Sequence, residues 1–256
     1  MSLSNDFKYK DLTKKENKIY HILITKIKNW IKQKVNSANA KGISLGISGG
    51  IDSATLSIIA SDIFPNNSHF YYFKINEDKE TEKLIIELQN SRNLKINTID
   101  LTKIYKDMVK LLNTNGDLVK SNLKSRLFMT SLYSLSQENN TLVLGTDNFD
   151  EFYLGYFTKY GDGGCDLLPF ANIKKSDIYV LANLLNVPKK IIDNEPSANL
   201  YKNQTDEKEL GFSYEEFEKW ILDKNLVPNE ISKRIINLHK LTEHKRIEIP
   251  KGPKLK

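Results

Sequence analysis

Residues 43–53 have the sequence ISLGISGGIDS, and this segment decides the fold that we expect. The apolar run Ile43–Ile47 is typical of a short buried strand. Gly49 and Gly50 follow it and indicate a tight turn. A helical pattern then covers Ala54–Ile63 and ends before Pro65. The segment therefore predicts a strand, a glycine turn and a helix in succession.

The same alternation continues along the chain. Further strands are expected at 70–74, 95–99 and 141–144, and helices at 16–36, 80–91, 102–112, 122–137, 174–185, 213–223 and 228–241. Strands that alternate with helices predict an α/β fold, with a doubly wound, mostly parallel, Rossmann-like sheet and helices on both faces. Two stretches, 147–164 and 194–211, have no clear period, and we expect long loops there, the second of them mobile.

We expect one domain over residues 1–256. It would consist of a helical N-terminal segment (16–36), an α/β core (about 43–186) and a C-terminal part with a loop and helices (about 187–256).

The composition narrows the class of protein. Hydrophobic residues make up 39% of the 256 residues and charged residues 27%, as in ordinary globular proteins. No apolar run approaches the roughly 18 residues of a membrane span, and residues 1–18 lack the apolar stretch of a secretory signal. We therefore expect a cytoplasmic protein with no membrane partner. The net charge of +6 suits a polyanion, but nearly all the basic residues are lysines, and we expect no nucleic-acid partner.

Cys165 is the single cysteine, which excludes a disulfide within the chain and any Cys-x-x-Cys site. Packing beside a glycine turn is favoured over a nucleophilic role, because no histidine lies near it in sequence.

Residues 48–53 have the properties of a phosphate-binding loop. They lie at the end of the first strand, where ligands of such sheets bind. The glycines let backbone N–H groups approach an anion, the next helix adds its N-terminal dipole, and Ser48 and Ser53 offer hydroxyl groups. Asp52 fits such a site if it holds a Mg²⁺ that binds phosphate oxygens.

The alternative for residues 48–53 is a plain strand-to-helix turn with a capping Ser or Asp. The motif Gly-x-x-x-x-Gly-Lys-Ser/Thr is absent, which points away from γ-phosphoryl transfer.

The run Ser48-Gly49-Gly50-Ile51-Asp52-Ser53 resembles the loop of the ATP pyrophosphatase family, whose members cleave ATP between the α- and β-phosphates. Within that family, a later stretch is similar to the signature of NAD synthetases. It comprises Gly145-Thr146-Asp147, Glu151, residues 157–164 (FTKYGDGG) and Asp166. Matching motifs follow the same order at 121–126 (SNLKSR), 196–200 (PSANL), 205–211 (TDEKELG) and 243–246 (EHKR), so the resemblance covers roughly residues 16–250.

The resemblance implies roles for the matched residues. Asp52 and Glu151 would hold Mg²⁺. ATP would be bound by Ser48, Gly49, Gly50, Ile51, Asp52, Ser53, Thr146, Lys175 and Ser197. Deamido-NAD would be bound by Arg126, Tyr156, Lys159, Asp162, Asp166, His244 and Lys245. The catalytic residues would be Asp52, Asp162 and Lys175, with Asp162 as the base that takes a proton from ammonium. The alternatives are a solvated carboxylate at Glu151, an exposed helical lysine at Lys175 and a plain surface tail at His244 and Lys245.

Two positions depart from the family pattern. Relatives usually carry an arginine that contacts ATP at the end of the second strand, whereas residues 70–74 are FYYFK here. Either Lys74 substitutes for it or the contact is lost. The threonine of the 196–200 loop is Ser197 here, which keeps the hydroxyl group.

The resemblance also implies the reaction and the partners. Deamido-NAD would be adenylated by Mg-ATP on its nicotinate carboxylate, and ammonia would then displace AMP to give NAD. Glutamine-using relatives carry an extra amidase domain for which 256 residues leave no room, so free ammonia is expected unless a separate subunit supplies it. A homodimer is expected, with helices 16–36 and 122–137 as interface or as core. The rival hypotheses are a tRNA-modifying enzyme of the same loop family and a nucleotide-binding regulator without catalysis.

Overall fold

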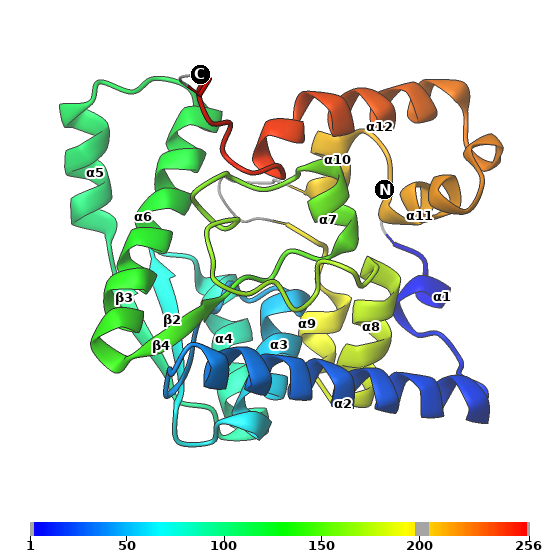
Figure 1. Ribbon diagram of the computed structural model, residues 1–256, viewed down its shortest axis with the longest axis horizontal. Helices are drawn as coiled ribbons and strands as arrows, with labels where there is room; N and C mark the ends of the chain where they lie inside the picture. Colours follow the sequence, from blue (N-terminus) through cyan, green and yellow to red (C-terminus); the bar gives the residue numbers. More distant parts are fainter. Residues whose placement is uncertain (1–2, 198–204, 255–256) are drawn as a thin grey trace.

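A parallel sheet of four strands forms the centre of the computed structural model, which describes residues 3–197 and 205–254 (Figure 1). The strands are β1 (Gly42–Gly46), β2 (Ser68–Lys74), β3 (Ile96–Asp100) and β4 (Thr141–Leu144). They lie in the order β3-β2-β1-β4, and every neighbouring pair is parallel. All four expected strands are thus present, with bounds shifted by at most two residues. The expected α/β fold is confirmed.

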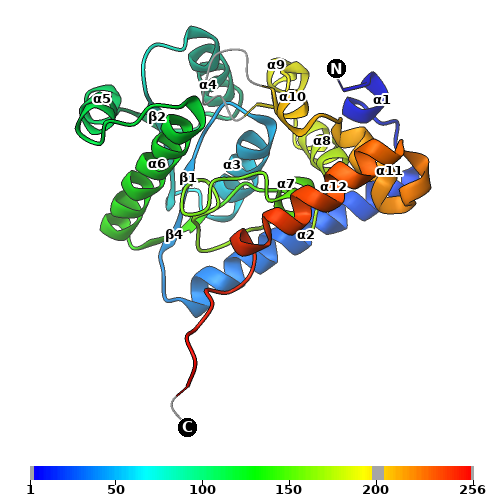
Figure 2. The ribbon, with the colours of Figure 1, turned by 90° about the horizontal axis from the view of Figure 1, so that it is seen from above.

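Both faces of the sheet are covered by helices (Figures 1 and 2). The helices are α1 (Asn5–Lys8), α2 (Lys14–Ser37), α3 (Ile51–Ile63), α4 (Lys79–Arg92), α5 (Thr102–Leu111), α6 (Asp117–Asn139), α7 (Phe149–Leu154), α8 (Lys175–Leu184), α9 (Lys189–Asp193), α10 (Asp206–Leu210), α11 (Tyr214–Leu222) and α12 (Asn229–Leu241). Helices α2, α3 and α8 lie on one side of the sheet, whereas α5 and α6 lie on the other.

The side chains of β2 show why the sheet is buried on both faces. Successive residues of a strand point to opposite faces. Phe70 and Tyr72 accordingly join the core that contains α2, α3 and α8, whereas Tyr71 and Phe73 join a second core against α6. A continuous apolar run is the expected signature of a parallel strand covered on both sides.

The structure corrects several expected element bounds. Helix α3 begins at Ile51 rather than Ala54, so Asp52 and Ser53 lie in its first turn. The stretch 147–164 is not one long loop, because it contains α7, and 194–211 contains α10. Residues 198–204, where a mobile loop was expected, lie outside the described residues. In the part of the chain that is described, no helix has the length and apolar character needed to cross a bilayer.

Candidate active site

A cavity of about 280 Å³ opens where β1 and β4 end, at the edge of the sheet where ligands of such folds bind. Most residues expected to bind ATP line it, namely Ser48, Gly50, Ile51, Asp52, Ser53, Thr146, Lys175 and Ser197. Glu151, Tyr156 and Asp162 line it as well. The fold therefore brings together residues that lie up to 149 positions apart, Ser48 and Ser197 being the extremes.

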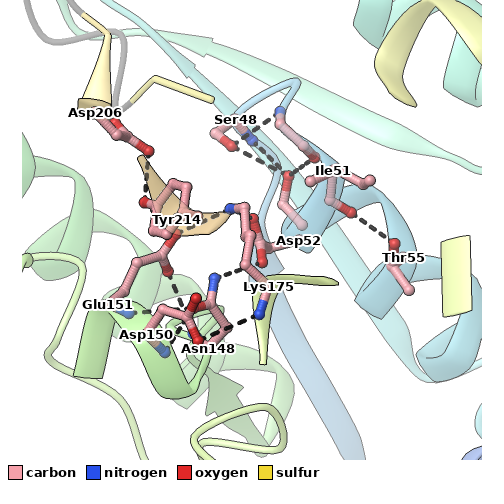
Figure 3. A network of polar contacts seen from close by, with 12 residues as sticks. Ser48, Ile51, Asp52, Thr55, Asn148, Asp150, Glu151, Lys175, Asp206 and Tyr214 are labelled. Carbon is pink, nitrogen blue, oxygen red and sulfur yellow. Dashed lines mark hydrogen bonds and ion pairs between the residues drawn. The ribbon is translucent and has the colours of Figure 1, made fainter. Parts of the chain in front are cut away.

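The loop between β1 and α3 is held by its own hydroxyl groups (Figure 3). Ser48 Oγ lies 3.1 Å from Ser53 Oγ and accepts a hydrogen bond from Gly50 N, while Ser53 Oγ donates to the Gly50 carbonyl. Gly49 has a φ of +84°, a left-handed conformation that favours glycine. The loop thus presents the N-terminus of α3, with its dipole and backbone amides, to the cavity.

Lys175 lies between two carboxylates (Figure 3). Its Nζ is 2.6 Å from Asp52 Oδ2 and 3.0 Å from Glu151 Oε1, and its side chain is 2% exposed. Burial by itself would lower the pKa of Lys175, but the attraction of Asp52 and Glu151 raises it well above its ordinary value. Lys175 therefore carries a positive charge. Neither an exposed helical lysine nor a solvated surface carboxylate at Glu151 fits this arrangement.

Asn148 connects the two carboxylates and was not singled out from the sequence. Its side-chain oxygen accepts hydrogen bonds from the amides of Asp150 and Glu151 and caps α7, and its Nδ2 donates to Asp52 Oδ1 at 3.0 Å. Glu151 Oε2 completes a capping box by accepting from Asn148 N. An Asn followed three residues later by Glu was the local signal that could have identified it.

Tyr214 and Asp206 extend the same network from the C-terminal part. The Tyr214 hydroxyl donates to Asp206 Oδ2 at 2.9 Å and lies 3.4 Å from Glu151 Oε1. Lys175 Nζ lies 5.2 Å from the centre of the Tyr214 ring, within the range of a cation–π contact. Asp206 belongs to a motif that matched the family, but no local pattern indicates that it meets Glu151 through Tyr214.

Asp162 lines the same cavity and is held by α6 and by the turn that carries it. Its Oδ1 accepts a hydrogen bond from Ser125 Oγ at 2.6 Å and another from Thr158 N at 3.1 Å. The Ser125 hydroxyl also accepts from Asp162 N, so the carboxylate is fixed to α6 and to its own turn. A carboxylate held in this way suits a positioned proton acceptor.

We compared the chain with known families and proteins to find the family to which it belongs. The family model described as NAD synthase matches residues 23–249. An NH(3)-dependent NAD(+) synthetase of Mycoplasmopsis pulmonis is 49% identical to this chain over 85% of its length and 84% of the relative. The chain belongs to the NAD synthase family. The fold and the cavity described above are thus those of a family member.

Two solved structures resemble most of the chain. The structure of NMN synthetase from Francisella tularensis has a TM-score of 0.86 and 33% identity, and the match covers 96% of this chain and 100% of that one. An NH3-dependent NAD synthetase from Campylobacter jejuni has a TM-score of 0.79 and 25% identity over 92% of this chain and 99% of that one.

Five residues expected to bind deamido-NAD are not among the described residues that line the cavity, namely Arg126, Lys159, Asp166, His244 and Lys245. Arg126 donates to the Lys159 carbonyl, and Lys159 Nζ donates to the His244 carbonyl. Lys245 Nζ donates to two carbonyls of the turn after α7. Asp166 accepts from Val143 N and from Tyr133, and so holds the end of the sheet.

Lys74 forms an ion pair with Glu82 at 2.7 Å. It is likewise not among the described lining residues. The structure thus gives no support to a role for Lys74 in place of the family's arginine.

Proposed function

We propose that this protein is an ammonia-dependent NAD synthetase. It is a ligase that uses ATP to convert the nicotinate carboxylate of deamido-NAD into the amide of NAD, with release of AMP and pyrophosphate. The observation that carries the proposal is the group of Asp52, Glu151 and Lys175 beside the Ser48–Ser53 loop, in the cavity at the sheet edge of a family member.

The side chains suit the two steps of such a reaction. The substrate carboxylate attacks the α-phosphorus of ATP, and the bond from that phosphorus to the bridging oxygen breaks. Lys175 and the backbone amides at the start of α3 stabilise the charge on the departing pyrophosphate. Ammonia then attacks the carbonyl carbon of the adenylate, and the C–O bond to AMP breaks. Asp162 takes the proton that ammonium loses before this attack, and the added nitrogen releases a further proton to water as AMP leaves.

Mg²⁺ is part of the proposal, and the two carboxylates suit it once Lys175, which pairs with both of them, turns to another partner. Asp52 and Glu151 would hold the ion, with Asn148 orienting Asp52. The described residues contain no group of three or more acidic, histidine or cysteine side chains suited to a metal. Two carboxylates suffice, because Mg²⁺ keeps several waters and takes phosphate oxygens as further ligands. When bound, the ion neutralises phosphate charge.

We also propose one domain and a homodimer. The apolar residues of α2, such as Ile27 and Ile31, lie in the core that also contains Phe217 and Ile235 of the C-terminal helices. Leu132 of α6 lies in the second core. Helix α2 is not covered along its whole apolar surface, because Ile19, Ile22 and Trp30 remain exposed on it. A further set of exposed apolar side chains lies on α5, directly after it and at the start of α6: Ile104, Leu111, Leu112, Leu118 and Val119. These five residues are called the α5–α6 patch below. The patch would form the dimer contact, and it includes the N-terminal part of α6, the helix that carries Arg126.

Synthesis of nicotinamide mononucleotide is the second candidate. It is favoured by the likeness to the Francisella tularensis protein described as NMN synthetase. The two activities use the same chemistry on substrates that differ by one nucleotide.

One assay separates the candidates. The protein is mixed with Mg-ATP, with either deamido-NAD or nicotinate mononucleotide, and with either ammonium or glutamine. We expect NAD and AMP in equal amounts from deamido-NAD and ammonium alone. Amidation of the mononucleotide instead would establish the second candidate. AMP release that required tRNA would contradict both.

A further inference from the structure

Lys175 occupies the space between the two carboxylates that are proposed to hold the metal. Its Nζ contacts an oxygen of Asp52 and an oxygen of Glu151, which come from different helices (Figure 3). A cation bound by the same two oxygens would need the position that this ammonium group holds. The lysine and a metal ion bridging both carboxylates therefore exclude each other.

The lysine is held firmly in this position. Its side chain is 2% exposed, and the Tyr214 ring lies 5.2 Å from its charge. Breaking a buried ion pair by withdrawing one partner leaves uncompensated charge and is strongly unfavourable. Mg²⁺ in water also loses its hydration shell reluctantly. The bare ion thus has little to gain by displacing Lys175.

A nucleotide changes this balance because it brings acceptors for the lysine. The Ser48–Ser53 loop lines the same cavity as Lys175, and phosphate oxygens form strong charge-assisted hydrogen bonds with an ammonium group. We propose that Lys175 keeps divalent metal away from Asp52 and Glu151 until the phosphates of ATP draw its ammonium group out, so that metal and nucleotide enter the site together. This inference rests on the proposed binding of Mg-ATP in the cavity.

Mn²⁺ binding without nucleotide tests the inference directly. The free ion is followed by electron paramagnetic resonance during titration of the wild type and of the variants Lys175→Met, Lys175→Gln and Lys175→Arg. Removing the positive charge leaves two carboxylates facing each other, so the Met and Gln variants should bind Mn²⁺ at least about tenfold more tightly than the wild type. The Arg variant keeps the charge and should bind as weakly as the wild type.

Thermal unfolding supplies a second readout and shows that the variants fold. Mn²⁺ should raise the midpoint of the Met and Gln variants by several degrees, because a ligand that binds only the folded state stabilises it. The midpoints of the wild type and the Arg variant should hardly change.

Two results would overturn the inference. One is equal Mn²⁺ affinity in the wild type and both uncharged variants, and the other is a wild type that already binds the bare ion tightly. Calorimetry of the wild type with Mg²⁺ and α,β-methylene-ATP tests the proposed function separately. Failure to bind this complex would count against the synthetase itself rather than against the role of Lys175.

Discussion

At the scale of single residues, Asp162 has the geometry of a positioned proton acceptor. Ser125 and Thr158 hold one of its oxygens, and the side chain lines the cavity. We expect Asp162→Asn to fold normally and to lower the rate of amide formation by about 10²–10⁴-fold, the usual contribution of a general base. Exchange of labelled pyrophosphate into ATP, measured with deamido-NAD and no ammonium, should persist.

The matched control for this variant is Asp62→Asn. Asp62 lies at the other end of α3 from Asp52 and pairs with Lys28 on the surface. Full amidation activity in Asp162→Asn, equal to that of the control, would remove the base role.

Cys165 provides a prediction about reactivity. Burial raises the pKa of its thiol to about 12, and repulsion by Asp147 and Asp166 adds to the effect. Because the folded pKa lies above the unfolded value, the neutral thiol contributes stability below about pH 9, which is lost as pH rises through 12. At pH 8 a disulfide reagent should modify the folded protein slowly and the unfolded protein rapidly. Rapid modification of the folded protein would contradict this prediction. Cys165→Ser should remain active, because Cys165 is expected to pack beside a glycine turn and not to act as a nucleophile.

At the scale of elements, the β1–loop–α3 unit could be predicted because its signals are local: an apolar run, two glycines and a helical pattern. Helix α7 could not be predicted from periodicity, since its six residues are too few to show a period. Its capping pair, Asn148 and Glu151, was visible in the sequence. The contact of Asp206 with Glu151 through Tyr214 was not, because only the fold brings those elements together.

Asn148→Ala tests the link between a helix cap and the site. The variant loses the cap of α7, which typically contributes about 1 kcal/mol, and it removes the amide that donates to Asp52. We expect a lower free energy of unfolding in urea and a raised KM for ATP. Thr13→Ala removes the cap of α2, far along the chain from the cavity, and should lower stability by a similar amount while leaving that KM unchanged. Equal KM values in both variants would contradict the role of Asn148.

At the scale of the whole molecule, the burial of both sheet faces could be predicted from the apolar strands. The division of α2 and α6 between core and surface could not, because sequence alone does not say which partner covers an apolar face. The structure places Ile27 and Ile31 of α2 and Leu132 of α6 in the two cores. Ile19, Ile22 and Trp30 of α2 stay exposed, and so does the α5–α6 patch. Of these two exposed sets, the α5–α6 patch is the one proposed for the dimer contact, because it includes the start of the helix that carries Arg126.

Leu118→Glu tests the dimer. Leu118 is 70% exposed in the α5–α6 patch, and Leu222 on α11 is 72% exposed elsewhere, so Leu222→Glu is a matched control. Light scattering should show a dimer for the wild type and the control. It should show a monomer, or a dimer weakened at least about tenfold, for Leu118→Glu, since a charge in an apolar contact is unfavourable. A monomeric wild type would contradict the proposed assembly.

The central claim is that the cavity activates a carboxylate by joining it to AMP. Deamido-NAD labelled with ¹⁸O in its nicotinate carboxylate tests this most directly, because the attacking oxygen stays with the α-phosphorus when ammonia displaces AMP. After turnover with Mg-ATP and ammonium, mass spectrometry should find one ¹⁸O in each AMP and none in pyrophosphate. Label in inorganic phosphate or pyrophosphate, or NAD formed with unlabelled AMP, would contradict the account.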